Sequence, residues 1–267
     1  MLFYSTGDMP SIEKINSIFE LLRKNYKVGL TNKEISSELK MPASTCYRIL
    51  AKLKKYNYVY QQPSNKRYFL GFAHLRFAEA VRESMSISTV CLPYLEDLHR
   101  RTDETTFVAI WDGKSCVALE VAGYINTRVS IGSGEIMPLH CSATGKAVLA
   151  FLPDRERERI IDQLDFYPYT KNTIVNPKDL KKNLEEIYEN GVAYCLQEFH
   201  NGINALAAPI FDNNNHVVAA IAVVGIHIDL DEDTLEEYSG LFLNAAYNIT
   251  AVLGGRYPDH LMEKINE

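Results

Sequence analysis

Residues 31–55 carry helix signals that narrowly limit how this part of the chain folds. Thr31 and Glu34 have the spacing of a capping box, in which each side chain bonds the other residue's backbone N–H at a helix start. Pro42 ends that short helix, because proline disfavours helical backbone at the preceding residue and suits the first turn of a new helix. A second helix is predicted over 43–55. Its apolar face consists of Cys46, Ile49, Leu50 and Leu53.

The flanking segments complete a small domain. Apolar residues recur at helical spacing over 12–22 and predict a preceding helix that ends near Lys24. Strand-like runs at 58–60 and 68–70 are joined by a polar turn. Three helices and a basic hairpin predict a winged helix-turn-helix over residues 1–71. A small helical subdomain with a merely solvated basic face is the alternative.

Charge is divided unevenly along the chain. Residues 1–71 contain 12 Lys and Arg against 5 Asp and Glu, a formal charge of +7, whereas the whole chain carries −6. A basic segment joined to an acidic remainder is expected when one part contacts phosphate and the other does not. We therefore predict that the N-terminal domain binds double-stranded DNA. The side chains expected to contact DNA are Ser44, Thr45, Tyr47, Arg48 and Lys52 on the second helix, with Lys66 and Arg67 at the end of the turn.

The remainder of the chain predicts a linker and a larger α+β domain. A helix over 72–82 is apolar on more than one side, so residues 72–84 should link the domains and pack against a second copy. Burial of this helix against its own domains is the alternative. Within residues 85–267 the predicted helices are 87–101, 143–151, 154–164, 177–190 and 231–253, and the predicted strands are 106–111, 116–121, 128–131, 192–196, 203–211 and 217–226. A single, mostly antiparallel sheet with flanking helices and a small-molecule cleft is expected.

Composition argues against several other classes of protein. No run reaches the roughly 20 apolar residues that a membrane span needs. Residues 1–10 lack the pattern of a secretory signal, so a cytoplasmic protein without membrane contact is expected. The five cysteines are scattered and never spaced C-x-x-C, which favours free thiols over disulfides or structural zinc. No glycine-rich nucleotide motif occurs, and no cofactor is predicted.

Several motifs resemble those of IclR-type transcription regulators. Residues 42–53 are similar to their recognition helix, and residues 137–150 resemble the first signature of their effector domain. A second signature is matched in order and spacing by residues 191–194, 198–203 and 207–210, and the following strand by 219–225. The resemblance implies a GAF-like effector domain and a homodimer or homotetramer that reads an inverted-repeat operator. It further implies repression that is controlled by a small organic-acid or aromatic effector.

The resemblance also implies which residues line the effector site. They are Val129, Ala143, Thr144, Cys195, Ile203, Ala205, Ala222 and Val224. Where family members bind small oxo-acids, the positions of Cys195, Ala222 and Val224 tend to hold an acid and two serines. A polar ligand group buried beside the weakly polar residues found here would lose hydrogen bonds. We therefore expect a larger or more apolar effector, such as an aromatic or aliphatic acid.

The start of the predicted helix 143–151 offers a physical reason for a binding site. Ser142 is suited to cap this helix. The backbone N–H groups of Ala143, Thr144 and Gly145 then lie at the positive end of the helix dipole, where they suit a carboxylate. The alternative is that these small residues serve only close packing of the helix on the sheet.

Two further classes of function stay open on the residues alone. His140, Cys141 and Cys195 would form a metal site or a nucleophilic pair only if two distant motifs met in space, and neither Glu198 nor His200 lies in a catalytic motif. A basic winged helix is also hard to explain on an enzyme, so enzymatic activity is not expected. An architectural DNA-binding protein is the other class, and its DNA affinity would not respond to an effector.

Overall fold

The computed structural model describes residues 11–84, 86–123 and 129–265. The chain separates into two compact units, residues 1–84 and 85–267. The first ten residues, where no secretory signal is expected, lie outside the described part of the chain. Among the residues that are described, no helix has the length and apolar composition needed to cross a membrane.

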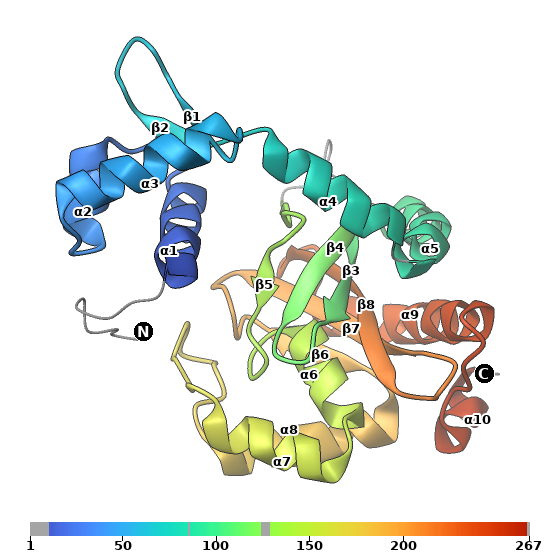
Figure 1. Cartoon of the computed structure of the whole chain (residues 1–267). Helices are drawn as coiled ribbons and strands as arrows, with labels where there is room; N and C mark the ends of the chain where they lie inside the picture. The colour runs from blue at the N-terminus through green and yellow to red at the C-terminus, as the bar shows by residue number, and fades with distance from the viewer. Residues whose placement is uncertain (1–10, 85, 124–128, 266–267) are drawn as a thin grey trace. The chain divides into compact units, whose positions relative to one another are not determined.

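The first unit is a winged helix-turn-helix (Figure 1). Its elements are α1 (Ser11–Lys24), α2 (Asn32–Glu38), α3 (Ala43–Lys55), β1 (Val59–Gln61), β2 (Tyr68–Leu70) and α4 (Ala73–Ser84). The predicted capping box is present, because the Glu34 N–H donates to Thr31 Oγ1 at 3.3 Å and the Thr31 N–H donates to Glu34 Oε2 at 2.7 Å. β1 and β2 pair antiparallel and form the wing.

The three helices and the wing share one small core. Its most deeply buried side chains are Ile18, Leu22, Ile35, Cys46 and Leu50. Gly29 lies in the left-handed region with a φ of 66°, and a Cβ there would lie 2.5 Å from the Phe69 ring, so this turn requires glycine. Leu30 forms an isolated antiparallel bridge with Tyr68. The wing is therefore attached to the connection between α1 and α2.

The second unit is built on one six-stranded antiparallel sheet of order β5-β4-β3-β8-β7-β6. Its strands are β3 (Thr105–Trp111), β4 (Cys116–Ala122), β5 (Ile136–Met137), β6 (Ala193–Leu196), β7 (Ile203–Phe211) and β8 (Val217–Ile226). Its helices are α5 (Ser86–Thr102), α6 (Ala143–Phe151), α7 (Asp154–Gln163), α8 (Pro177–Asn190), α9 (Glu232–Val252) and α10 (Met262–Ile265), with a 3-10 turn over Asp259–Leu261. The predicted single sheet with flanking helices is confirmed.

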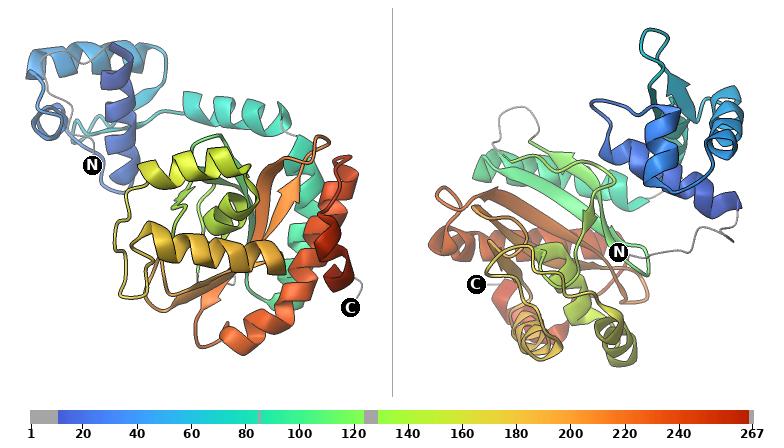
Figure 2. Two further views of the ribbon diagram at one scale, coloured as in Figure 1. Left: turned by 90° about the horizontal axis from the view of Figure 1, so that it is seen from below. Right: turned by 90° about the vertical axis from the view of Figure 1, so that its left-hand side faces the viewer.

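Helices cover both faces of this sheet (Figure 2). α6 packs against β6, β7 and β8 on one face, with α8 beyond it, whereas α5 and α9 pack on the other face. Thr106 belongs to the α5 face, because its Oγ1 donates to the Leu95 carbonyl of α5 at 2.8 Å. Side chains alternate between faces along a strand, so Thr105 and the residues in register with it lie on the α6 face.

One predicted strand is wrong, and three short elements (β5, the 3-10 turn and α10) were not predicted. Arg128 lies outside the described residues, and residues 129–131 form no strand. The Val129 carbonyl instead accepts a hydrogen bond from Thr105 Oγ1 at 2.5 Å, and a turn at Gly132–Gly134 leads into β5, which pairs with β4. Ile131 is buried and Val129 is half-buried, so the apolar residues of this segment are covered without strand pairing. The 3-10 turn and α10 follow the last predicted helix.

Candidate DNA-binding surface and effector site

The exposed face of α3 carries the side chains predicted to contact DNA. Cys46, Leu50 and Leu53 are buried in the domain core, as expected for the apolar face. On the other side Ser44, Tyr47, Arg48 and Lys52 are exposed, and Thr45 is partly buried. Tyr47 is 59% exposed on this face. The structure therefore leaves this face of α3 free for a ligand, and DNA contact by these residues remains a prediction.

The two predicted wing residues differ in their surroundings. Lys66 is exposed at the turn, with a φ of 59°. Arg67 instead points into the domain, where its guanidinium donates to the Gly29 carbonyl at 2.8 Å and to both carboxylate oxygens of Glu34 at 3.1 Å. These bonds use three of the five guanidinium N–H groups and fix the wing to α2, so Arg67 has a structural role. DNA contact by Arg67 stays a prediction.

The loop before α6 folds tightly onto the first turn of that helix. Ser142 is the N-cap, since its Oγ accepts from the Gly145 N–H at 3.0 Å and donates to the Pro138 carbonyl at 2.7 Å. A Cβ on Gly145 would lie 2.6 Å from the Pro138 carbonyl oxygen. The amide of Gly145 is therefore used by the cap, and its lack of a side chain serves this packing. The expectation that this amide binds the effector is not supported.

The backbone N–H groups of Ala143 and Thr144, also at the start of α6, are not used by the helix cap. Within the described residues, the N–H groups of Ala143 and Thr144 donate no hydrogen bond, and Thr144 Oγ1 is buried without a partner. Thr144 is only 1% exposed, so an unmet hydroxyl there carries a real free-energy cost. Three unmet donor groups at the positive end of a helix dipole form a suitable site for a carboxylate.

The sheet brings most of the predicted effector residues together on the α6 face. Cys195, Ala205, Val224 and Thr105 follow one another across β6, β7, β8 and β3 in register. Ala222 lies in the next row on the same face, and the Val129 carbonyl is bonded to Thr105. Ile203 pairs with Ile226 at the end of β7. No polar motif marks Thr105 at the start of β3, so the sequence does not predict its place in this row.

The thiols on this face are neutral. Burial raises the pKa of the Cys141 thiol to about 12, and burial also raises the pKa of Cys195, whose sulfur faces the N–H groups of Phe199 and Glu198. Such thiols are poor nucleophiles and poor metal ligands at neutral pH. The wall formed by Cys195, Ala205 and Val224 is therefore uncharged and mostly apolar.

His140 has a structural role in the loop before α6. Its Nε2 lies 3.1 Å from the Tyr167 carbonyl, and its ring packs against Phe166 and Tyr169. Burial lowers the pKa of its imidazole. No group of three or more metal-ligating side chains is found in the described ranges, so the suggested cluster of His140, Cys141 and Cys195 is not assembled as a metal centre there.

An ion pair lies buried between α6 and the connection that follows β6. Lys146 Nζ donates to Glu198 Oε1 at 2.5 Å, and the Lys146 side chain is 1% exposed. Burial raises the pKa of Glu198, and the nearby Lys146 opposes that shift. Lys146 and Glu198 lie 52 positions apart, so no local sequence pattern predicts their pairing.

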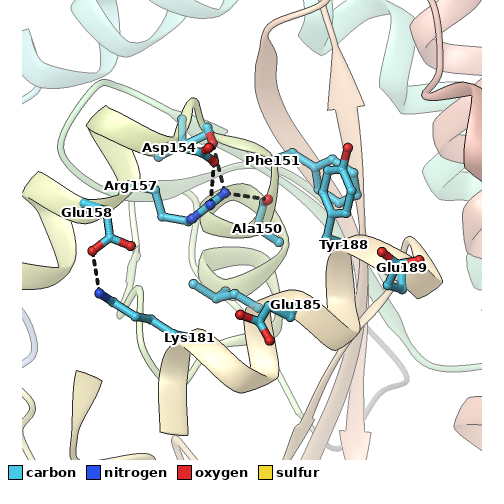
Figure 3. Close-up of a pocket in the computed structure, with 11 residues that line it drawn as sticks. Ala150, Phe151, Asp154, Arg157, Glu158, Lys181, Glu185, Tyr188 and Glu189 are labelled. Carbon is cyan, nitrogen blue, oxygen red and sulfur yellow. Dashed lines mark hydrogen bonds and ion pairs between the residues drawn. The ribbon is translucent and has the colours of Figure 1, made fainter. Parts of the chain in front are cut away.

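A surface cavity of about 300 Å³ lies at the other end of α6, between α7 and α8 (Figure 3). Arg157 donates to the carbonyls of Ala150 and Leu152, at 3.3 and 3.2 Å, and pairs with Asp154 at 2.6 Å. These bonds place a cation at the negative end of the α6 dipole. The cavity is therefore part of the anchoring of α6, and we assign it no ligand.

Comparison with known proteins identifies the family. The family model "Bacterial transcriptional regulator IclR C-terminal" matches residues 79–251, and "Sugar-specific transcriptional regulator TrmB" matches residues 19–71. The HTH-type transcriptional repressor AllR of Escherichia coli (strain K12) is 31% identical over 91% of this chain and 90% of its own.

Solved structures agree with this assignment. The crystal structure of the Thermotoga maritima IclR covers 91% of this chain and 99% of its own, with 29% identity and a TM-score of 0.72. An IclR homolog from Microbacterium hydrocarbonoxydans, solved with 4-hydroxybenzoate, shares the fold at 20% identity and a TM-score of 0.70, over 90% of this chain and 98% of its own. These relatives are transcription regulators and not enzymes, and this chain belongs to the IclR family of transcriptional regulators.

Proposed function

We propose that the protein represses transcription from an inverted-repeat operator, and that a small aromatic or aliphatic carboxylic acid bound in its C-terminal domain controls this repression. The observation that carries the proposal is the start of α6. There the N–H groups of Ala143 and Thr144 and the Thr144 hydroxyl, which have no hydrogen-bond partner among the described residues, lie at the positive end of the helix. The relative AllR is itself named a repressor.

The DNA contacts follow from the exposed face of α3. Arg48 has the fork geometry that binds guanine edges or phosphate, and Ser44 and Thr45 lie at the helix start, which enters the major groove first. Lys52 and Lys66 are exposed cations suited to the phosphate backbone. Tyr47 adds an exposed aromatic side chain on α3.

Pairing of two copies through α4 would place two such helices on one operator. One side of α4 packs on its own domain, where His74 Nε2 lies 2.9 Å from the Tyr58 carbonyl and Phe77 stacks on Tyr58 at 5.8 Å. Phe72 and Leu75 are nevertheless 78% and 66% exposed. Apolar side chains this exposed favour a contact with a second copy. A homodimer, or a homotetramer made of two dimers, is proposed.

The chemistry of the effector follows from the two sides of its site. The donors of α6 favour a carboxylate. The uncharged wall of Cys195, Ala205 and Val224 favours an apolar body, because a polar group placed there would lose its hydrogen bonds with water. A benzoate-like acid satisfies both conditions, and the Microbacterium relative was solved with 4-hydroxybenzoate. An effector of this kind would control DNA binding if it favoured one arrangement of the paired DNA-binding domains.

Selection of genomic DNA fragments by the purified protein tests this proposal. Enrichment of one palindromic site is expected, followed by fluorescence anisotropy titration of that site with benzoate, 4-hydroxybenzoate, pyruvate and glyoxylate. We expect a benzoate-like acid to shift the DNA affinity. Preference for pyruvate or glyoxylate would contradict the proposed effector class. Salt-sensitive binding without an enriched site or a ligand effect would instead indicate an architectural protein.

A further inference from the structure

The Lys146–Glu198 pair has hydrogen-bonding capacity that the protein does not use. An ammonium group carries three N–H donors. In the described part of the chain, Glu198 Oε1 is the only acceptor that Lys146 Nζ contacts. Glu198 is 8% exposed, and among the described residues its other oxygen, Oε2, is buried without a hydrogen bond of ordinary geometry, the Leu196 N–H being the backbone donor close to this carboxylate. Buried charged groups are ordinarily paired and fully hydrogen-bonded, so these unmet groups require an explanation.

Both side chains open into a cavity of about 560 Å³ at the β6 edge of the sheet. We call it the Lys146 cavity. Its lining comes from α6, α8, β6, the residues after β6, α9 and α10, and its polar members besides the ion pair include Asn183, Glu232, Glu236 and Ser239. Asn183 Oδ1 is a second buried acceptor that has no partner in the described ranges of the chain. The cavity volume falls in the range of small-molecule sites.

The lining selects among classes of ligand by charge. A carboxylic acid would meet the carboxylates of Glu198, Glu232 and Glu236, which outnumber the two cations of the lining, Lys146 and Lys264. A carboxylate also has no proton to donate to Glu198 Oε2. An amine would donate to these acceptors, but its charge would be repelled by the buried Lys146 ammonium. A hydroxyl group both donates and accepts. Neighbouring hydroxyls of one molecule are therefore able to accept from Lys146 and donate to Glu198 Oε2.

We infer that the Lys146 cavity is a second small-molecule site, which binds a neutral polyhydroxylated compound. One hydroxyl accepts from Lys146 Nζ, another donates to Glu198 Oε2, and a third reaches Asn183 Oδ1. Tyr194 and Leu196 of β6 supply apolar surface for the carbon skeleton. This site is separate from the carboxylate site at Ala143 and Thr144, and its occupancy does not depend on the effector proposed above.

Saturation-transfer NMR on the full-length protein tests this inference with four probes: D-xylose, myo-inositol, 1,5-diaminopentane and acetate. The expected result is transfer to one or both polyols, with competition between them. Asn183→Ala removes one acceptor of the cavity, and Glu236→Gln removes a negative charge from its lining, both without unpairing the buried Lys146. Asn183→Ala should weaken polyol binding by about tenfold, as expected for loss of one hydrogen bond, and Glu236→Gln should weaken it because an amide oxygen accepts less strongly than a carboxylate.

Two further variants serve as controls. Glu237→Gln changes the neighbouring exposed glutamate of α9, which does not line the cavity, and should leave polyol binding unchanged. Thr144→Val should weaken carboxylic-acid binding and leave polyol binding unchanged, which separates failure of this site from failure of the effector site. Binding of diaminopentane or acetate alone, binding of no probe, or polyol binding that survives both Asn183→Ala and Glu236→Gln would each overturn the inference.

Discussion

The guanidinium of Arg67 and the carboxylate of Glu34 join the wing to the first turn of α2, with two N–O distances of 3.1 Å. The same carboxylate accepts from the Thr31 N–H in the capping box. One residue therefore holds together a helix start and a hairpin that are distant in sequence. The Arg67–Glu34 ion pair fixes the position of the wing beside α3. DNA contact by Lys66 depends on that position.

Arg67→Ala should lower the midpoint of thermal unfolding and weaken DNA binding, whereas Lys66→Ala should leave the midpoint unchanged. The Thr31 N–H is the largest cause of the lowered Glu34 pKa, and Arg67 adds to it. Because the pKa of Glu34 is lower in the folded protein than its ordinary value of 4.5, ionised Glu34 stabilises the fold above pH 4.5. This stabilisation is lost as the pH falls through the pKa of Glu34 in the folded protein. The difference between parent and variant should therefore shrink in acid. Calorimetry at pH 7 and below pH 4 checks this. An unchanged midpoint at neutral pH would show that the pair is not structural.

Arg48→Ala should weaken the free energy of specific operator binding by on the order of 1–3 kcal/mol, because it removes a contact to one base or phosphate. Anisotropy titration with the selected operator and a scrambled duplex measures this loss. Lys66→Ala is the contrasting variant, since loss of a phosphate contact weakens binding to both duplexes and reduces the salt slope by about one. If Arg48→Ala bound the operator as tightly as the parent, α3 would not present Arg48 to the DNA.

Thr144→Val should weaken binding of a benzoate-like acid by about tenfold to a hundredfold, since a hydrogen bond to a charged group is worth roughly 1.5–3 kcal/mol. The substitution preserves shape and removes a hydroxyl that has no partner inside the described protein, so the fold should not lose stability. Isothermal calorimetry of parent and variant checks both statements. Ser142→Ala provides a comparison, because it removes the N-cap and should lower stability by about 1 kcal/mol. If Thr144→Val and the parent bound the acid with equal affinity, the carboxylate of the ligand would not contact the Thr144 hydroxyl.

Local patterns in the sequence predicted most of the fold, because the signals that set the elements are themselves local. Asn176 and Gly191 bound α8 as a cap and a left-handed stop, and the turn before Val217 separates β7 from β8. The features that the sequence did not predict depend on contacts between segments that are distant in the chain. The ion pairs Arg67–Glu34 and Lys146–Glu198 join distant segments, and no sequence motif predicts either of them. The Gly145 amide was assigned to the ligand because the sequence does not show that Ser142 Oγ reaches it first.

Ala222→Ser with Val224→Ser should shift ligand preference toward small oxo-acids. Both positions lie on the α6 face of β8, next to the row that contains Cys195 and Ala205. Two new hydroxyls would bond a polar ligand, and would cost about 1–3 kcal/mol each when a benzene ring leaves them unpaired. Calorimetry with benzoate and pyruvate measures the change. Ala219→Ser, on the opposite face of the same strand, is the matched control. Retained benzoate preference in the double variant would show that β8 does not line the site.

Native Cys141 and Cys91 should resist alkylation at pH 8. Burial is the largest cause that raises the pKa of each thiol to about 12. At pH 8 roughly one thiol in ten thousand is then a thiolate, which is the reactive form. A raised thiol pKa means that the folded protein retains the proton, so stability should fall as pH rises above the ordinary value of 9.0. Iodoacetamide labelling followed by peptide mass spectrometry checks the reactivity, with unfolded protein as the positive control. Rapid labelling of native Cys141 would mean that the loop before α6 opens, and the carboxylate site at Ala143 and Thr144 would not be preformed.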